Sequence, residues 1–116
     1  MQIAPGSPPS LLVACLCAAW CGSCRDYRAL FDGVAAGFPG ATFRWVDIED
    51  EADRVDPVEV ENFPTLLIAT DGVARFFGPL TPHRETLVRL VRAHAEVPGP
   101  AVPAADVQAL VARLAS

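Results

Sequence analysis

The segment from Leu11 to Cys17 restricts the possible folds more than any other, because every residue in it is apolar. A strand with one face in water alternates between apolar and polar residues, whereas an unbroken apolar run indicates a strand covered on both faces. Such strands occur in parallel or mixed sheets between layers of helices. The chain has 116 residues, of which 52% are hydrophobic. That is enough for one domain with its own core.

The next segments alternate between helix and strand periodicity. From Cys21 onward, apolar residues recur every three or four positions until the turn residues at 37–40, which predicts a helix. Residues 41–48 then predict a second strand, which a right-handed crossover makes parallel to the first. A short helix or turn near 51–55 is expected to end at Pro57.

The second half predicts a hairpin followed by helices. Strands at 65–70 and 73–77 flank Asp71-Gly72, a strong hairpin signal. Thr81 is expected to cap a helix that has Pro82 at its first position and ends near Ala95. The chain is therefore divided into an N-terminal arm at 1–10, a domain at 11–95, a Pro-rich linker at 96–103 and a C-terminal helix at 104–116.

The charge pattern argues against a nucleic-acid partner. The net charge is −5, and the nine basic residues, all Arg, are scattered along the chain. Phosphate binding needs clustered basic side chains.

No apolar run reaches the roughly 20 residues of a membrane span, so no membrane partner is expected. Leu12–Cys15 resembles a lipoprotein cleavage box, but residues 1–10 contain no basic residue, and we expect a cytoplasmic protein.

Two cysteines separated by two residues at a predicted helix start form a candidate redox site. The free N–H groups and the helix dipole at that position stabilise an anion, which favours a nucleophilic thiolate at Cys21. Cys24 lies one helical turn further on, where it can attack a mixed disulfide on Cys21 and release the substrate. The pattern predicts Cys21 as the attacking thiol and Cys24 as the resolving thiol.

Around this pair the sequence resembles the thioredoxin superfamily over residues 11–95. The residues that carry the resemblance are Trp20-Cys21-Gly22-Ser23-Cys24, Trp45-Val46-Asp47-Ile48-Glu49, Asn62-Phe63-Pro64-Thr65-Leu66-Leu67-Ile68, Asp71-Gly72 and Gly78.

The resemblance implies a three-layer α/β/α sandwich and a thiol-disulfide oxidoreductase acting on protein disulfides. It also implies a thioredoxin-reductase-type electron donor. We expect neither a cofactor nor a metal. Pro64 is implied to be a cis proline facing the cysteine pair, Phe63 to offer its backbone to an extended substrate, and Trp20 to shield the thiols.

Several positions differ from the usual thioredoxin pattern. Ser23 replaces a proline, and together with Gly22 it is expected to modulate the redox poise. Cys15 and Trp45 stand where relatives keep a buried Asp and a nearby Lys, so both partners of the usual proton relay are missing. Ala29 replaces the proline that kinks the helix in many relatives.

Cys15 and Cys17 add two thiols close to the pair. We interpret both as free, buried, small hydrophobic residues that modulate the site, and the resemblance places Cys17 beside the active pair. A zinc or iron–sulfur site is the alternative, but four thiols on one strand and one helix turn do not converge as metal ligands usually do. Two further alternatives are a disulfide isomerase or oxidant, suggested by Ser23, and a redox-inert module that binds clients at Phe63-Pro64.

Thioredoxins usually begin with a strand and a helix before the central strand, whereas here only ten Pro-rich residues precede Leu11. We therefore expect four strands in the order 41–48, 11–17, 65–70, 73–77, with the first edge covered by Gln2-Ile3-Ala4 or by another molecule. The helix at 104–114 is expected to take the place of the missing first helix.

Overall fold

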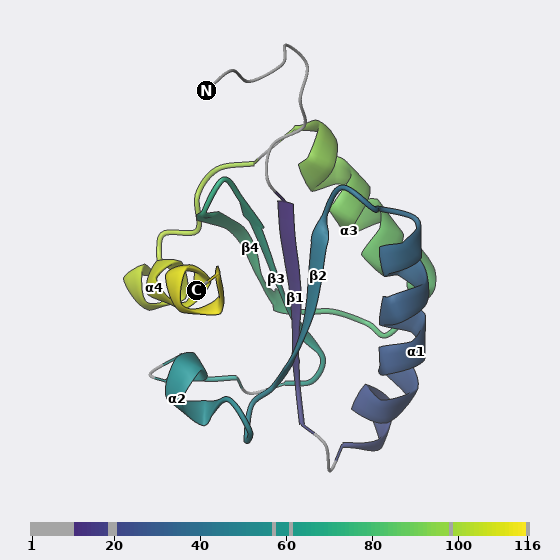
Figure 1. The fold of residues 1–116 in the computed structure, drawn as a ribbon, viewed down its shortest axis with the longest axis horizontal. Coiled ribbons are helices and arrows are strands. Elements are labelled where there is room, and N and C mark those ends of the chain that lie inside the picture. Colours follow the sequence, from purple (N-terminus) through teal and green to yellow (C-terminus); the bar gives the residue numbers. More distant parts are fainter. Residues whose placement is uncertain (1–10, 19–20, 57, 61, 98, 116) are drawn as a thin grey trace.

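The structure, a computed structural model, describes residues 11–18, 21–56, 58–60, 62–97 and 99–115. In chain order the elements are β1 (Leu11–Cys17), α1 (Gly22–Ala36), β2 (Thr42–Asp47), α2 (Ala52–Val55), β3 (Thr65–Thr70), β4 (Val73–Pro79), α3 (Arg84–Glu96) and α4 (Ala105–Ala115). The strands form one four-stranded sheet in the order β2-β1-β3-β4, between two layers of helices (Figure 1). Both the strand order and the α/β/α architecture predicted from the sequence are confirmed.

β1 lies inside the sheet, as its apolar run predicts. It pairs in parallel with β2 and antiparallel with β3. All of its residues except Leu12 are buried. Helices cover both faces of the sheet, so side chains pointing either way from β1 enter a core.

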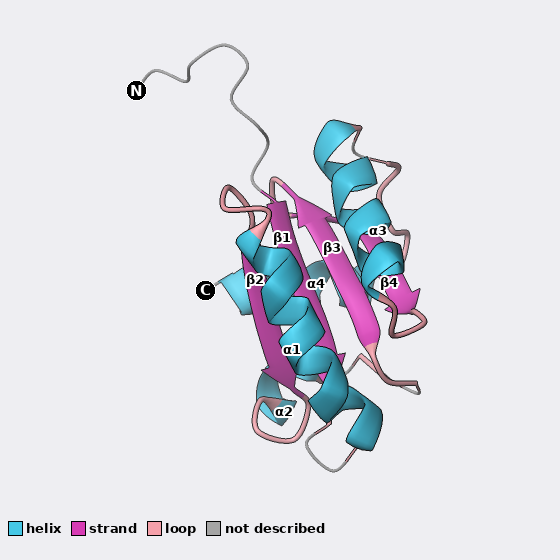
Figure 2. Cartoon of the chain, turned by 90° about the vertical axis from the view of Figure 1, so that its right-hand side faces the viewer, coloured by secondary structure: helices cyan, strands magenta, loops and turns pink. Residues whose placement is uncertain are grey.

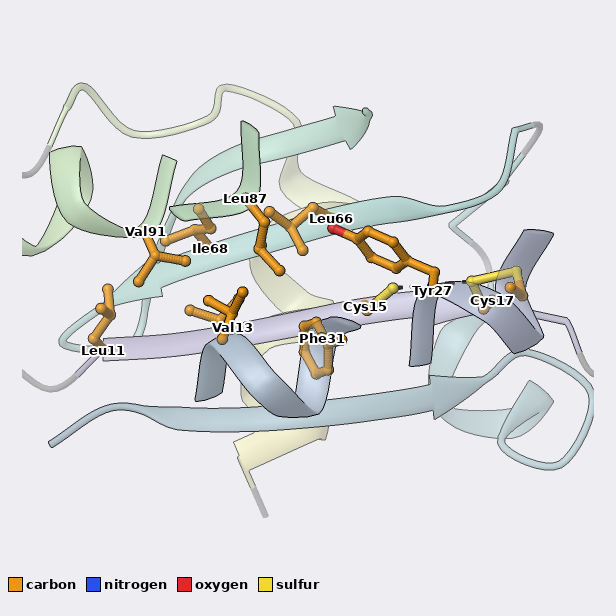
Figure 3. Close-up of a cluster of buried hydrophobic side chains, with 12 residues drawn as sticks. Leu11, Val13, Cys15, Cys17, Tyr27, Phe31, Leu66, Ile68, Leu87 and Val91 are labelled. Carbon is orange, nitrogen blue, oxygen red and sulfur yellow. Dashed lines mark hydrogen bonds between the residues drawn. A yellow bond between two sulfur atoms is a disulfide. The ribbon is translucent and has the colours of Figure 1, made fainter. Parts of the chain in front are cut away.

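The two faces of the sheet have separate cores. α1 and α3 cover one face, and α4 and α2 lie on the other (Figures 1 and 2). The first core holds the odd-numbered residues of β1 together with Tyr27, Phe31 and the buried side chains of α3 (Figure 3). The second core holds Ala14 and Leu16 of β1 and the buried stripe of α4. All cysteines therefore belong to the α1 side of the sheet.

The hairpin between β3 and β4 forms at Asp71-Gly72. Both residues have positive φ, 51° and 81°. A two-residue hairpin turn of type I′ needs positive φ at both positions, and Asp and Gly tolerate it better than other residues.

The start of α3 differs from the prediction. His83 occupies the N-cap with extended dihedrals, and the helix begins at Arg84. The His83 N–H bonds the Thr81 carbonyl at 2.7 Å, so Thr81 and Pro82 form a tight turn before the helix. The expected Thr81 cap with Pro82 at the first helical position is wrong by two residues.

α4 covers the face of the sheet opposite α1, which buries its apolar stripe as expected. It is also held against the outer edge of β4, where Gln108 and Val102 bond the backbone of Ala74. The arm segment Gln2-Ile3-Ala4, expected along β2, lies outside the described residues. Arg44 of β2 donates to the Leu114 carbonyl at 2.7 Å, which ties this edge strand to the end of α4.

Candidate active site

Three cysteines meet where β1 passes into α1. Cys17 ends β1, Cys21 is the N-cap of α1, and Cys24 lies in the first turn of that helix. The Cys21 N–H bonds the Ala18 carbonyl at 3.0 Å, which turns the chain sharply from strand to helix. Trp20, which the resemblance makes a shield for the thiols, lies outside the described residues.

Cys24 forms a disulfide with Cys17, with a Cα–Cα distance of 5.7 Å. Both residues are 1% exposed, whereas Cys21 is a free thiol of intermediate exposure. The interpretation of Cys17 as a free thiol is therefore wrong, and Cys24 is bonded to Cys17 instead of its predicted partner Cys21. The reason is tertiary: Cys17 points from the sheet into the same core layer that receives Cys24 from α1.

Cys15 is a free, buried thiol, as predicted. Its Sγ atom lies 3.9 Å from Sγ of Cys17 (Figure 3). Because Cys17 is in a disulfide and carries no hydrogen, the Cys15 thiol is the donor. Burial raises the pKa of Cys15 to about 12. Its register partner on β2 is Trp45, so both positions of the usual relay hold groups unsuited to accept a proton at neutral pH.

Tyr27 of α1 lies over this part of β1 (Figure 3). Its hydroxyl is buried and has no hydrogen-bond partner among the described residues. Burial, and secondarily the neighbouring Cys15, raise the pKa of the Tyr27 hydroxyl. Helical periodicity places Tyr27 in the buried stripe, but nothing in the sequence indicates that it sits next to Cys15.

Pro64 lies directly before β3, the strand that pairs with β1 near the cysteines. The antiparallel register ends with the pair Leu16 and Thr65, and Cys17 and Pro64 are the residues next to this pair. The Phe63–Pro64 peptide bond is cis, the form that the resemblance implies. Phe63 is half-buried and packs, like Cys21, against the core that contains the disulfide. The structure therefore brings Cys17, Cys21, Cys24, Phe63 and Pro64 together at one end of the sheet.

The remaining side chains near the site are exposed or structural. Gly22 and Ser23 are exposed in the first turn of α1, and the described first turn contains no acidic residue. Arg28 lies over the ring of Trp45 at 5.3 Å.

Within the described ranges, no group of three or more His, Cys, Asp or Glu residues could hold a metal ion. No helix in the described part of the chain is long and apolar enough to cross a membrane.

Comparisons with known proteins agree with this geometry. The family model described as Thioredoxin matches residues 6–92. A thioredoxin of Chlamydia pneumoniae is 34% identical over 80 residues, which cover 67% of this chain and 76% of that protein. A thioredoxin H-type of Fagopyrum esculentum is 30% identical over 89 residues, covering 75% and 74%.

Among solved structures, thioredoxin from Trypanosoma brucei brucei superimposes with a TM-score of 0.66 at 27% identity, covering 78% of this chain and 79% of that one. The matched region includes the strand, the cysteine helix and the Phe63-Pro64 segment that form the site. The chain belongs to the thioredoxin family and is a thiol-disulfide oxidoreductase.

Proposed function

We propose that the protein exchanges a Cys21/Cys24 dithiol with protein disulfides. The Cys21 thiolate attacks one sulfur of a client disulfide, forms a mixed disulfide and releases the other client sulfur as a thiolate. The Cys24 thiolate then attacks the Cys21 sulfur, forms the Cys21–Cys24 disulfide and releases the second client thiolate. Two electrons pass from the enzyme thiols to the client.

One observation carries this assignment: Cys21 is the partly exposed sulfur at the helix start, whereas Cys24 is buried behind it. A client can approach Cys21 but not Cys24. Cys21 lies at the N-terminus of α1, where the helix dipole favours negative charge, and the first turn has no acidic side chain to oppose it.

Single substitutions test the order of attack. Cys21→Ser should abolish insulin reduction, since no nucleophile remains at the exposed position. Cys24→Ser should instead accumulate a mixed disulfide on Cys21, seen as a client-sized mass increase that dithiothreitol removes. Trapping by the Cys21→Ser variant would reverse the assignment.

Client binding is proposed at the segment that faces the cysteines. Pro64 follows the register pair Leu16–Thr65 next to Cys17, and Phe63 packs on the same core as Cys21, so an extended client placed along this segment has its disulfide near the attacking sulfur. Trp20 precedes Cys21 in the chain and is proposed to shield it. Phe63→Ala should raise KM for a protein client more than it lowers kcat.

The missing relay predicts a pH-dependent turnover. Cys24 must lose its proton before it attacks, and Cys15 cannot accept that proton near neutrality because its pKa is raised to about 12. Turnover should therefore rise with pH between about 7 and 9, since Cys24 must ionise without a neighbouring group that accepts its proton. A rate that stays constant across this range at saturating reductant would show that another group accepts the proton.

The electron donor is proposed to be a thioredoxin-reductase-type enzyme in the cytoplasm, where such systems keep thiols reduced. One similar solved structure concerns the thiol-resolving mechanism of a yeast mitochondrial 1-Cys peroxiredoxin through the glutathione and thioredoxin systems. Reduction of the oxidised protein by a thioredoxin reductase and NADPH, followed as NADPH consumption, tests this. If several such reductases fail to reduce the protein while dithiothreitol still supports its activity, the proposed electron donor is wrong.

A second function, disulfide isomerisation, is favoured by the observed pairing. With Cys24 held by Cys17, Cys21 remains free to attack a client disulfide while no enzyme thiol is available to resolve it. A thiol of the client must then complete the exchange, which rearranges the client without net oxidation. Reactivation of scrambled ribonuclease by the oxidised protein would measure this activity.

A further inference from the structure

The disulfide in the structure joins Cys24 to a cysteine outside the Cys-x-x-Cys pair. We propose that Cys17 is a third catalytic cysteine, which takes the disulfide over from Cys21 and stores it as the buried Cys17–Cys24 bond. This inference rests on the proposed function, in which Cys21 meets the client. It adds an internal exchange step and a sheltered oxidised form.

Cys24 is placed to bond either partner. Cys21 is the N-cap of α1 and Cys24 lies three residues later, in the first turn of the same helix, so the two residues are neighbours. On the other side, the 5.7 Å separation of the Cys17 and Cys24 Cα atoms is within the usual disulfide range. All three side chains contact one core, so the three sulfur atoms belong to the same region of the molecule.

The internal step balances without an external reactant. After a client has been reduced, the enzyme holds a Cys21–Cys24 disulfide and a Cys17 thiol. The Cys17 thiol loses its proton, and its sulfur attacks Sγ of Cys24. The Cys17–Cys24 bond forms, the Cys21–Cys24 bond breaks, and Cys21 leaves as a thiolate that takes up a proton from solvent. Among Cys17, Cys21 and Cys24, one disulfide and one thiol are therefore present both before and after the step.

Groups around the cysteines stabilise the thiolate that leaves in each direction of the exchange. The thiolate released at Cys21 lies at the N-terminus of α1, where backbone N–H groups and the dipole favour negative charge. In the reverse step Cys17 leaves as the thiolate, and the Cys15 thiol, 3.9 Å away, is placed to donate a hydrogen bond to it. Cys15 is therefore a positioning residue for this exchange.

Burial protects the Cys17–Cys24 disulfide from direct attack by external thiols. Cys17 and Cys24 are each 1% exposed, so an external thiol cannot reach either sulfur directly. Reduction must instead pass through Cys21, which first reopens the stored bond by attacking Cys24. Because Cys21 is free in the stored form, the oxidised protein can still engage a second disulfide.

Differential labelling of the oxidised wild-type protein tests the linkage. The protein is quenched in acid and unfolded in denaturant that contains N-ethylmaleimide, so that buried free thiols are also alkylated. The disulfide is then reduced, and the released thiols take an isotopically heavy label for mass spectrometry. The light label is expected on Cys15 and Cys21, and the heavy label on Cys17 and Cys24. Heavy label confined to Cys21 and Cys24 would overturn the proposal.

Reduction kinetics with dithiothreitol test the sheltering. Cys17→Ala can hold only the reachable Cys21–Cys24 bond and should be reduced about tenfold faster than wild type, as expected if the stored form holds roughly nine in ten oxidised molecules. Cys17→Val, whose side chain fills the space of the Cys17 thiol, should be reduced as fast as Cys17→Ala. Cys21→Ser lacks the entry point and should be reduced more slowly than wild type. Val13→Ala, on the same face of β1, is the packing control and should match wild type.

The outcomes separate this proposal from the one on which it rests. Equal reduction rates in wild type, both Cys17 variants and Cys21→Ser would overturn the storage step, whatever their activity on insulin. Retained insulin reduction in Cys21→Ser would overturn the proposed attacking thiol, whatever the labelling shows. If neither Cys17 variant folds, the wild-type labelling and the Cys21→Ser rate still decide the matter.

Discussion

The side chain of Gln108 bonds α4 to the backbone at the edge of β4. Its Oε1 accepts the N–H of Ala74 at 2.9 Å, and its Nε2 donates to the carbonyls of Ala74 at 3.1 Å and Val102 at 2.8 Å. Ala74 is fully buried. β4 is an edge strand, so these bonds satisfy backbone groups that no neighbouring strand reaches.

Replacing Gln108 by Ala should destabilise the fold by about 2–3 kcal/mol. The Ala74 carbonyl keeps a bond from the Val102 N–H at 2.9 Å, so the main loss is the buried Ala74 N–H, whose desolvation costs about 1–3 kcal/mol. The two bonds donated by Nε2 add to this loss, partly compensated by water, and the better helix propensity of Ala returns about 0.4 kcal/mol.

Urea unfolding followed by circular dichroism measures this change as a shift of the midpoint at constant m-value. Gln108→Glu separates the two roles of the amide: it keeps the acceptor for Ala74 N–H but cannot donate to the carbonyls, and it should also lose stability. Ala109→Gln, on the exposed side of α4, is the control for a Gln/Ala exchange without these bonds. A loss below about 0.5 kcal/mol for Gln108→Ala would refute the assignment of these bonds.

Three further substitutions test the two cores. Tyr27→Phe removes a buried hydroxyl without a partner among the described residues and should raise the free energy of unfolding by about 1 kcal/mol in urea; a loss would point to a hidden partner. Leu110→Ala empties a fully buried site in the α4 core and should cost about 2–5 kcal/mol; a neutral result would mean that α4 contributes little. Burial raises the pKa of Cys15 from 9.0 to about 12, so the folded state favours the protonated thiol. The stabilisation that Cys15 gains from burial of its protonated thiol is complete below pH 9 and is lost as the pH rises toward 12. Between pH 7.5 and 10 wild type should therefore lose about 1 kcal/mol more stability than Cys15→Ala. Parallel pH profiles of the two proteins would contradict this.

Local patterns were sufficient for most of the fold. The apolar run of β1 predicts a strand covered on both faces, and the Asp71-Gly72 signal predicts the hairpin, because each pattern reflects the periodicity of one element. Boundaries are less well determined by such patterns. Thr81 and Pro82 suit a helix start, but the bond from the His83 N–H to the Thr81 carbonyl forms a turn there, and α3 begins at Arg84.

The sequence likewise predicts some parts of the candidate site and not others. The spacing of Cys21 and Cys24 at a helix start, and the later Phe63-Pro64, identify the chemistry from the sequence alone, since helix position and proline are local properties. The partner of Cys24 depends instead on where the end of β1 lies beneath α1, and this places Cys17 within bonding distance. The same packing puts the Tyr27 ring over β1 near Cys15, a neighbour that no periodicity indicates. Sequence by itself therefore determined the family, the sheet order and the attacking thiol to be tested. Only the tertiary structure decided which sulfur atoms meet, because contacts between a strand and a helix depend on how the two pack and not on the spacing within either one.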